Sequence, residues 1–202
     1  MDSMHDIAKT AIDQAPPECR VRPEDADVSQ RHADALVGLG PEMVNAFYDT
    51  VYGHSETEKI FKPGERPMRE ESLQGWWERT VRGPLDDDYW AWMALVGLTH
   101  VIRRVNNPMM LAMANFVAQF VESSESLEIS DDERRELSVA FRRVSSTVSS
   151  IITFAYDHAV SSALFSVAGM PEALLARLRD QEVGDALDKA HKEVRSASLH
   201  GS

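Results

Sequence analysis

The chain has 202 residues, 43% of them hydrophobic, which is enough for one well-filled core and too little for two large domains. Its 33 acidic residues outnumber its 21 basic residues, and the net charge of -12 repels nucleic acids and anionic membranes. The single cysteine, Cys19, excludes an internal disulfide. No apolar run approaches the ~20 residues that span a bilayer, and the N-terminus lacks the apolar core of a signal peptide. We therefore expect a cytoplasmic protein.

The first half of the chain predicts several short helices. Residues 1–27 are polar and contain three prolines, so we expect a short N-terminal arm that docks a helical turn on the body. Apolar residues recur at helical spacing over 28–39 and 42–52, and glycines with Pro41 predict a tight corner between these two helices. A short helix with a loop follows over 54–66.

A helix over 67–82 is predicted to end at Gly83 and Pro84. The next helix has acidic residues in its first turn, at 86–88, and arginines in its last, at 103–104, which is the order that a helix dipole favours.

The second half predicts three longer helices. Asn106 to Pro108 interrupt the chain before an apolar helix that begins near Met109. Ser130 and Glu133 form a capping-box pattern in front of a helix that extends to about residue 168. Such a helix is about 58 Å long, more than one small domain can cover, so we expect part of it to pack on a second copy of the chain. A final amphipathic stretch covers about 172–194.

His100 stands on a helix face that carries no formal charge for three turns. Tyr89, Met93, Val96 and Gly97 share this face at steps of three and four residues. A neutral imidazole on an apolar face suits haem, because the iron takes a nitrogen donor and the macrocycle needs apolar walls. Gly97 would leave room for the ring to approach the backbone. A single histidine among apolar residues is, however, more often a core residue than a ligand.

Several motifs occur in a fixed order around this histidine. They are Phe47-Tyr48-Asp49, Ser55-Glu56-Thr57 with Phe61, Trp76 before Gly83, Asp86 with Tyr89, and Val96-Gly97-Leu98-Thr99-His100-Val101. In this order and spacing the chain resembles the globin domain of the globin-coupled sensors and their single-domain relatives, the protoglobins. The resemblance covers about residues 28–165.

The resemblance implies an all-α, globin-like fold, a 3-on-3 helical sandwich with an extra N-terminal segment and a long C-terminal helix. Its expected parts are an N-terminal arm (1–27), a sensor-type globin domain (28–168) and a C-terminal amphipathic tail or linker (169–202). It also implies haem b, with His100 as the iron ligand and Tyr48 as a hydrogen-bond donor on the distal side. The alternative interpretation of Tyr48 is an ordinary core tyrosine. The further cofactor contacts that we expect are Phe47, Phe61, Met68, Ser72, Trp76, Tyr89, Met93, Val96 and Gly97.

The haem carboxylates call for cations, and the candidates are Lys62, Arg66, Arg69, Arg103 and Arg104. Relatives carry basic residues after the tyrosine that starts the proximal helix, whereas this chain has Trp90-Ala91-Trp92-Met93. This departure puts the carboxylate contacts in doubt and favours an added apolar contact surface.

Three functions fit the pattern. The first is a globin that binds O2, NO or CO and senses the gas through a homodimer formed by its last two globin helices. Its signal would pass to a separate partner, or the chain would be the sensor part of a longer protein. The second is a haem-free, globin-like interaction module. The third is a haem enzyme such as an NO dioxygenase or a peroxidase. No hydrolase, kinase or zinc motif stands out, so we expect a binding protein rather than an enzyme.

Overall fold

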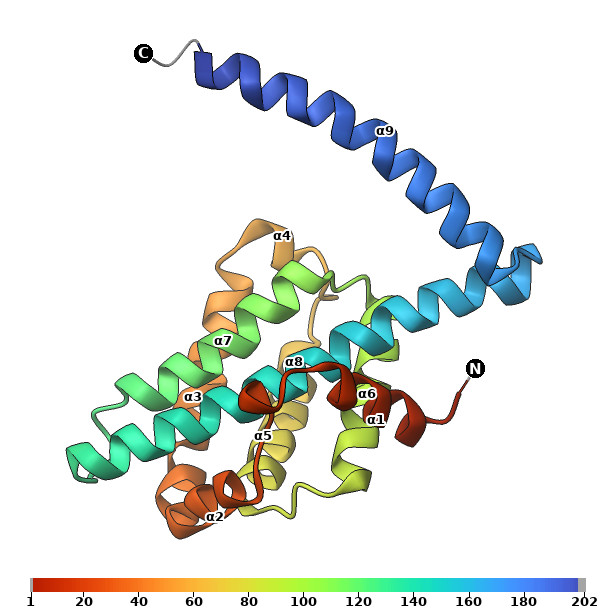
Figure 1. Ribbon diagram of the computed structural model, residues 1–202. Helices are drawn as coiled ribbons and strands as arrows, with labels where there is room; N and C mark the ends of the chain where they lie inside the picture. Colours follow the sequence, from red (N-terminus) through yellow and green to blue (C-terminus); the bar gives the residue numbers. More distant parts are fainter. Residues whose placement is uncertain (1, 200–202) are drawn as a thin grey trace. The chain divides into compact units, whose positions relative to one another are not determined.

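The computed structural model describes the backbone of residues 2–199 and the side chains of residues 2–192, and every regular element in this part of the chain is helical (Figure 1). The helices are α1 (Met4–Gln14), the 3-10 helix η1 (Pro17–Cys19), α2 (Pro23–Arg31), α3 (Ala33–Tyr52), α4 (Ser55–Glu58), α5 (Arg66–Arg82), α6 (Asp87–Arg103), α7 (Asn107–Ser123), α8 (Asp131–Ala168) and α9 (Glu172–Leu199). The chain forms two compact units, Met1–His158 and Ala159–Ser202, with the boundary inside α8.

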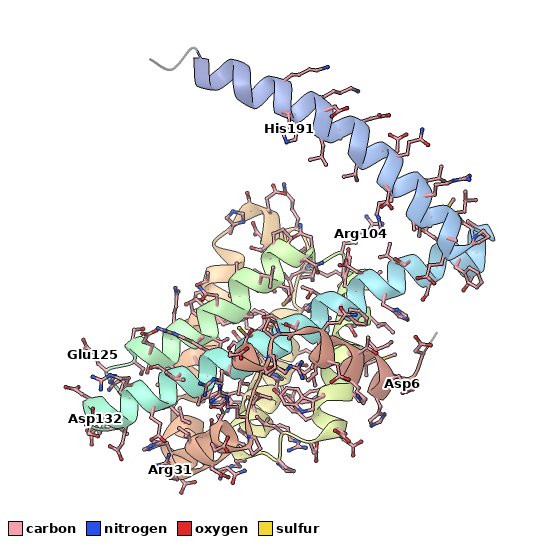
Figure 2. The ribbon with its side chains drawn as sticks, viewed as in Figure 1. Asp6, Arg31, Arg104, Glu125, Asp132 and His191 are labelled. Carbon is pink, nitrogen blue, oxygen red and sulfur yellow. The ribbon has the colours of Figure 1, made fainter. Side chains whose placement is uncertain are left out.

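The first unit has two buried clusters that share α8. In one, Met43 of α3, Trp77 of α5 and Phe141 of α8 are almost fully buried, and the indole Nε1 of Trp77 donates to the carbonyl oxygen of Leu36 at 2.8 Å. The other joins α1, α6 and the middle of α8, where Ile151 is fully buried. Charged side chains such as those of Arg31, Glu125 and Asp132 lie exposed at the edge of the unit (Figure 2).

The N-terminal segment contributes more to the core than its composition predicts. Instead of a single turn, it forms the 11-residue helix α1, whose N-cap Ser3 accepts a hydrogen bond from the backbone of Asp6. Ile7 and Ala11 on one face of α1 are buried against α6. Trp90 of α6 belongs to the same cluster, so part of the Trp90-Ala91-Trp92-Met93 sequence packs against α1.

The predicted corner at Gly40 and Pro41 is wrong, because α3 runs through both residues from Ala33 to Tyr52. The chain turns instead at His32, between α2 and α3. Proline inside a helix removes one backbone hydrogen bond, yet here the packing of the helix outweighs that loss. A Cβ on Gly40 would lie 2.9 Å from the Trp77 side chain, so this glycine permits α3 and α5 to pack closely.

Two other glycines fix the position of α6. Gly83 ends α5 with a φ of 67°, a left-handed conformation that glycine adopts without strain. Asp86 then caps α6 by accepting a hydrogen bond from the backbone of Tyr89 at 2.9 Å. On α6 itself, a Cβ on Gly97 would lie 2.6 Å from the carbonyl oxygen of Ile152 and 2.7 Å from the Cβ of Ala155. Gly97 therefore allows close contact between α6 and α8.

Helix α8 starts as its sequence predicts and is 38 residues long. The carboxylate of Glu133 accepts hydrogen bonds from the backbone and the hydroxyl of Ser130, at 2.9 and 2.6 Å. By length and composition alone α8 is apolar enough to cross a membrane, in contrast to the sequence-based expectation. Core helices pass the same test, and Ile151 and Ala155 on α8 are fully buried in the first unit.

Candidate functional site

The first unit contains an apolar cavity of about 430 Å³. Its volume falls in the range of about 300–1,000 Å³ that is typical of small-molecule sites. Side chains of α3, α5, α6, α7 and α8 and of the segment around α4 form its walls. They are Phe47, Tyr48, Val51, Thr57, Ile60, Phe61, Arg69, Ser72, Leu73, Trp76, Trp92, Met93, Val96, Thr99, His100, Arg103, Val105, Met109, Met110, Met113, Ala114, Val117, Ser145, Val148 and Ile152.

His100 projects into this cavity from the last turn of α6. Its Nδ1 atom is buried and has no hydrogen-bond partner within the described part of the chain. Burial lowers the pKa of the imidazole to about 4, because the charged form loses its hydration. The ring is therefore neutral at pH 7, which is the state in which histidine binds a metal.

Tyr48 lies on α3 and is only 7% exposed. Phe47 and Phe61 pack edge-on against its ring, with ring centroids 5.3 and 6.2 Å away. Its hydroxyl donates to the backbone carbonyl of Arg69 on α5, at 3.0 Å. Burial raises the pKa of this hydroxyl, so it keeps its proton and remains a donor.

Two arginines line the largely apolar cavity, and a carboxylate lies beside both. Arg103, on α6, donates from Nη1 to both oxygens of Glu65, at 3.0 and 2.9 Å. The Nη2 atom of Arg69 lies 3.7 Å from Oε1 of the same carboxylate. Hydrogen bonds from the backbone of Lys62 and from Arg103 lower the pKa of Glu65. The three side chains form an ion-pair cluster that joins the start of α5 to the end of α6.

A family model for the protoglobins matches residues 19–161, which is more than half of the chain. The chain belongs to the protoglobin family. Crystal structures of the globin domain of the E. coli DosC, in form I (ferric) and form II (ferrous), have a similar fold, each with a TM-score of 0.51 and 13% identity. The matches cover 74% and 75% of this chain and 96% and 97% of that domain. No curated protein matches the chain in sequence.

These comparisons confirm the predicted globin-like, all-α fold, and they place His100 and Tyr48 inside the matched region. In this protoglobin, eight of the eleven predicted site residues line one cavity. They are Phe47, Tyr48, Phe61, Ser72, Trp76, Met93, Val96 and His100. These residues come from α3, α5, α6 and the segment after α4, so the fold gathers side chains that lie up to 53 positions apart.

The other three predicted contacts do not line the cavity. Tyr89 is 1% exposed in the cluster with α1, and its hydroxyl forms a 2.8 Å hydrogen bond with Thr80. Gly97 faces α8 rather than the cavity, so its role as a space for haem is wrong. Met68 is 51% exposed, because the face of α5 that meets the cavity passes through Arg69 instead. The hydroxyl of Ser72, which does line the cavity, donates to the backbone carbonyl of Met68 at 3.1 Å.

Sequence reasoning named Arg69 and Arg103 only among five candidate cations, and both line the cavity. Of the other three, Arg66 pairs with Asp49 and Glu70, at 2.7 and 2.6 Å, and neither Lys62 nor Arg104 lines the cavity. The contributions of Trp92 and of Met110 and Met113 on α7 were missed, although the methionine-rich face of α7 was a signal. Within the described residues no group of three or more His, Cys, Asp or Glu side chains could hold a metal ion.

Proposed function

We propose that this protoglobin binds haem b in the cavity through His100 and, with it, a diatomic gas, and that it acts as a gas sensor. The observation that carries the proposal is the neutral imidazole of His100 at the wall of a largely apolar cavity, where its buried Nδ1 atom has no hydrogen-bond partner among the residues that the structure describes. A buried polar atom without a partner is costly, and such atoms are often found where a ligand completes the site. The family and the ferric and ferrous forms of the DosC globin domain support the same proposal.

The residues of the cavity fit the requirements of haem. Apolar side chains such as Val96 and Met110 can contact the macrocycle, and Arg69 and Arg103 offer cations to its carboxylates. His100 would be the axial ligand, and it needs no deprotonation at pH 7 because of its low pKa. Haem supplies an iron that binds O2, NO or CO reversibly.

Tyr48 would be the donor that favours a polar gas ligand. Its hydroxyl lies at the wall of a largely apolar cavity, where a hydrogen bond is stronger than in water. However, the hydroxyl already donates to the carbonyl of Arg69, so it must leave this acceptor to serve a ligand. That exchange costs about 0.5–1.5 kcal/mol, the net value of an ordinary hydrogen bond. Tyr48 is thus a donor whose contribution to gas affinity is partly offset by a competing acceptor.

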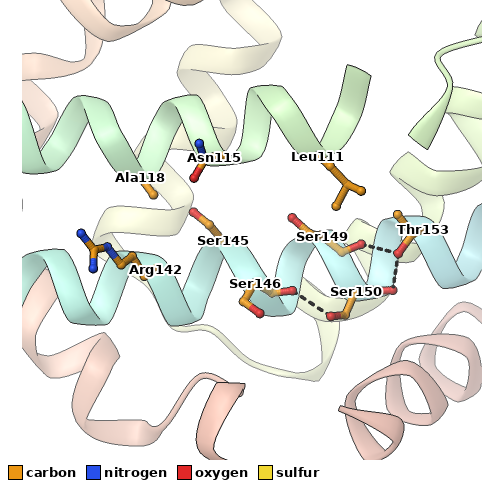
Figure 3. A pocket seen from close by; sticks show the side chains of 9 residues that line it. All are labelled: Leu111, Asn115, Ala118, Arg142, Ser145, Ser146, Ser149, Ser150 and Thr153. Atoms are coloured by element: carbon orange, nitrogen blue, oxygen red, sulfur yellow. Dashed lines mark hydrogen bonds between the residues drawn. The ribbon is translucent and has the colours of Figure 1, made fainter. Parts of the chain in front are cut away.

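The sensing role would use a homodimer formed by α7 and α8. In support, a groove of about 360 Å³ lies between these helices, and small polar side chains of α8, including Ser145, Ser149 and Thr153, line it (Figure 3). Near its end, α8 exposes Phe165 by 57% and Val167 by 88%. Gas binding transmits a signal only if it favours one dimer geometry by a differential free energy.

The test is an absorption spectrum of the purified chain supplied with haem, reduced and exposed to CO. We expect a sharp Soret band, which His100→Ala abolishes or shifts. Tyr48→Phe should speed O2 release more than CO release, whereas Tyr52→Phe serves as a control because Tyr52 does not line the cavity. Equal effects of Tyr48→Phe on both gases would remove the donor role. A wild-type chain that takes up no haem would contradict the haem proposal and leave the haem-free interaction module.

A further inference from the structure

The cavity reaches the surface between α5 and α6. Of its lining residues, Ser72 on α5 and Trp92 and Thr99 on α6 are exposed, and all the others are buried or half-buried. On the walls that α7 and α8 form, Met110 and Ile152 are only 6% and 5% exposed. The opening of the cavity is therefore bordered by α5 and α6.

These two helices are joined at both ends and not between them. At one end, the hydroxyls of Thr80 and Tyr89 form a 2.8 Å hydrogen bond. At the other end, Arg103 donates to both oxygens of Glu65, which directly precedes α5. From Trp92 to the residue before Arg103, no hydrogen bond or ion pair of the described residues connects α6 to α5. The opening thus has fixed ends and no polar contact across its middle.

The rim of the opening is largely apolar. The hydroxyl of Ser72 donates to the backbone carbonyl of Met68 at 3.1 Å, and that of Thr99 donates to the carbonyl of Leu95 at 3.0 Å. Both donors are therefore satisfied within their own helices. Met68 and Leu95, one turn away from these residues, are each 51% exposed. Exposed apolar side chains around a cavity favour the passage of apolar molecules over charged ones.

Trp92 is held in this opening by few contacts. It is 37% exposed, and its ring meets that of Tyr89 edge-on, with the ring centroids 6.2 Å apart. Its indole nitrogen has no hydrogen-bond partner in the described part of the chain. Tyr89, in contrast, is 1% exposed and bonded to Thr80. The Trp92 ring can therefore turn outward without breaking a hydrogen bond, while its neighbour stays in place.

We propose that the opening between α5 and α6 is the entry route of the cavity for small apolar molecules, and that Trp92 is its gate. When the ring turns outward, a molecule passes between Ser72 and Thr99. A side chain that obstructs a path slows entry and release alike, so its removal speeds both by similar factors. The route deepens the proposed function, and it rests on that function only where the molecule is a gas that binds to haem.

The first arm of the test uses the full chain without haem. The probe is N-phenylnaphthylamine, a neutral dye whose fluorescence rises in apolar surroundings and which is small enough for a cavity of this volume. Its binding and release are followed by stopped-flow fluorescence. We expect Trp92→Ala to raise both rate constants about two- to tenfold, since an aromatic edge contact has an energy of this order.

Two further variants make the result specific. Leu95→Ala is the matched control, because Leu95 is exposed on the same helix, one turn from Trp92, but does not line the cavity. It should leave both rate constants unchanged. Thr99→Trp places a second ring at the opening and should slow entry and release. Thr99 is exposed, so this change leaves the core intact, and circular dichroism checks the fold of each variant.

The second arm uses the chain supplied with haem and reduced. The association of CO and of n-butyl isocyanide is measured after a light flash. Trp92→Ala should speed the association of the isocyanide more than that of CO, because the larger molecule needs a wider opening.

Trp92→Ala with the dye kinetics of the wild type, or of Leu95→Ala, would overturn the gate. Thr99→Trp with unchanged kinetics would overturn the route, and so would a dye that binds neither the wild type nor Trp92→Ala. A wild-type chain that takes up no haem would contradict the proposed function instead, and the dye kinetics would still decide the route. The two failures can therefore be distinguished.

Discussion

Gly97→Ala tests the close packing of α6 on α8. A methyl group at this position would lie 2.6 Å from the carbonyl oxygen of Ile152 and 2.7 Å from the Cβ of Ala155, too close for either contact. Both atoms belong to the backbone or lie next to it, so the helices must separate. Overpacking of this kind costs about 1–3 kcal/mol. Alanine stabilises a helix relative to glycine by about 0.5–1 kcal/mol, so we expect a net loss of about 1 kcal/mol.

The matched control is Gly75→Ala on α5. Gly75 also lies inside a helix, but a Cβ there would have no neighbour within 4 Å among the described residues. Only the propensity gain remains, so Gly75→Ala should raise the free energy of unfolding by about 0.5–1 kcal/mol.

The assay is urea unfolding followed by circular dichroism, and the two variants should differ by about 2 kcal/mol in opposite directions from the wild type. The reasoning would be refuted if Gly97→Ala were as stable as Gly75→Ala, since α6 and α8 would then not meet at this glycine.

Three other substitutions test particular contacts. Trp77→Phe removes the hydrogen bond to Leu36 and part of a fully buried side chain, so the free energy of unfolding should fall by about 1–3 kcal/mol; an unchanged urea midpoint would contradict the packing of α3 on α5. The pKa of Glu65 is lowered in the folded state, so its carboxylate adds stability above the ordinary glutamate pKa, and this stability is lost as the pH falls through the folded pKa. Glu65→Gln should therefore be less stable than the wild type at pH 7 and equally stable in acid. A stability difference that does not change with pH would refute the ion pair. Burial lowers the pKa of His100 from 6.5 to about 4. The free energy of unfolding of the haem-free wild type should therefore fall by up to about 3 kcal/mol as the pH decreases from 6.5 to 4. His100→Leu should not show this decrease when acid unfolding is measured.

Local signals in the sequence predicted most of the helices. The Ser130 and Glu133 pattern and the acidic start of α6 predict helix starts because they depend on side chains within one turn of the cap. Gly40 and Pro41 gave the wrong prediction for the opposite reason. Glycine next to proline marks a break when only neighbours in sequence are considered, whereas here α5, far along the chain, packs closely on Gly40 and keeps α3 continuous.

In the candidate site, too, local sequence patterns were informative, whereas the packing of distant segments could not be predicted. Periodicity on α6 predicted Val96, Met93 and His100 on one face, and all three line the cavity. The same periodicity could not show that Gly97 faces α8 rather than the cavity, because the face of α6 that packs on α8 lies next to the face that lines the cavity. On α5, a shift of one residue separates Met68 from Arg69, and no local signal in the sequence fixes helix rotation to that precision.

Helix α6 is in contact with other elements along most of its length. α1 covers it near its start, α8 meets it at Gly97, and the pair of Arg103 with Glu65 ties its end to α5. A helix that is packed against its neighbours at three places resists bending at any one of them. A displacement of the His100 ring that shifts the backbone of α6 would therefore also change the contacts of α6 with the amino-terminal helix α1, which lies far from the cavity in sequence.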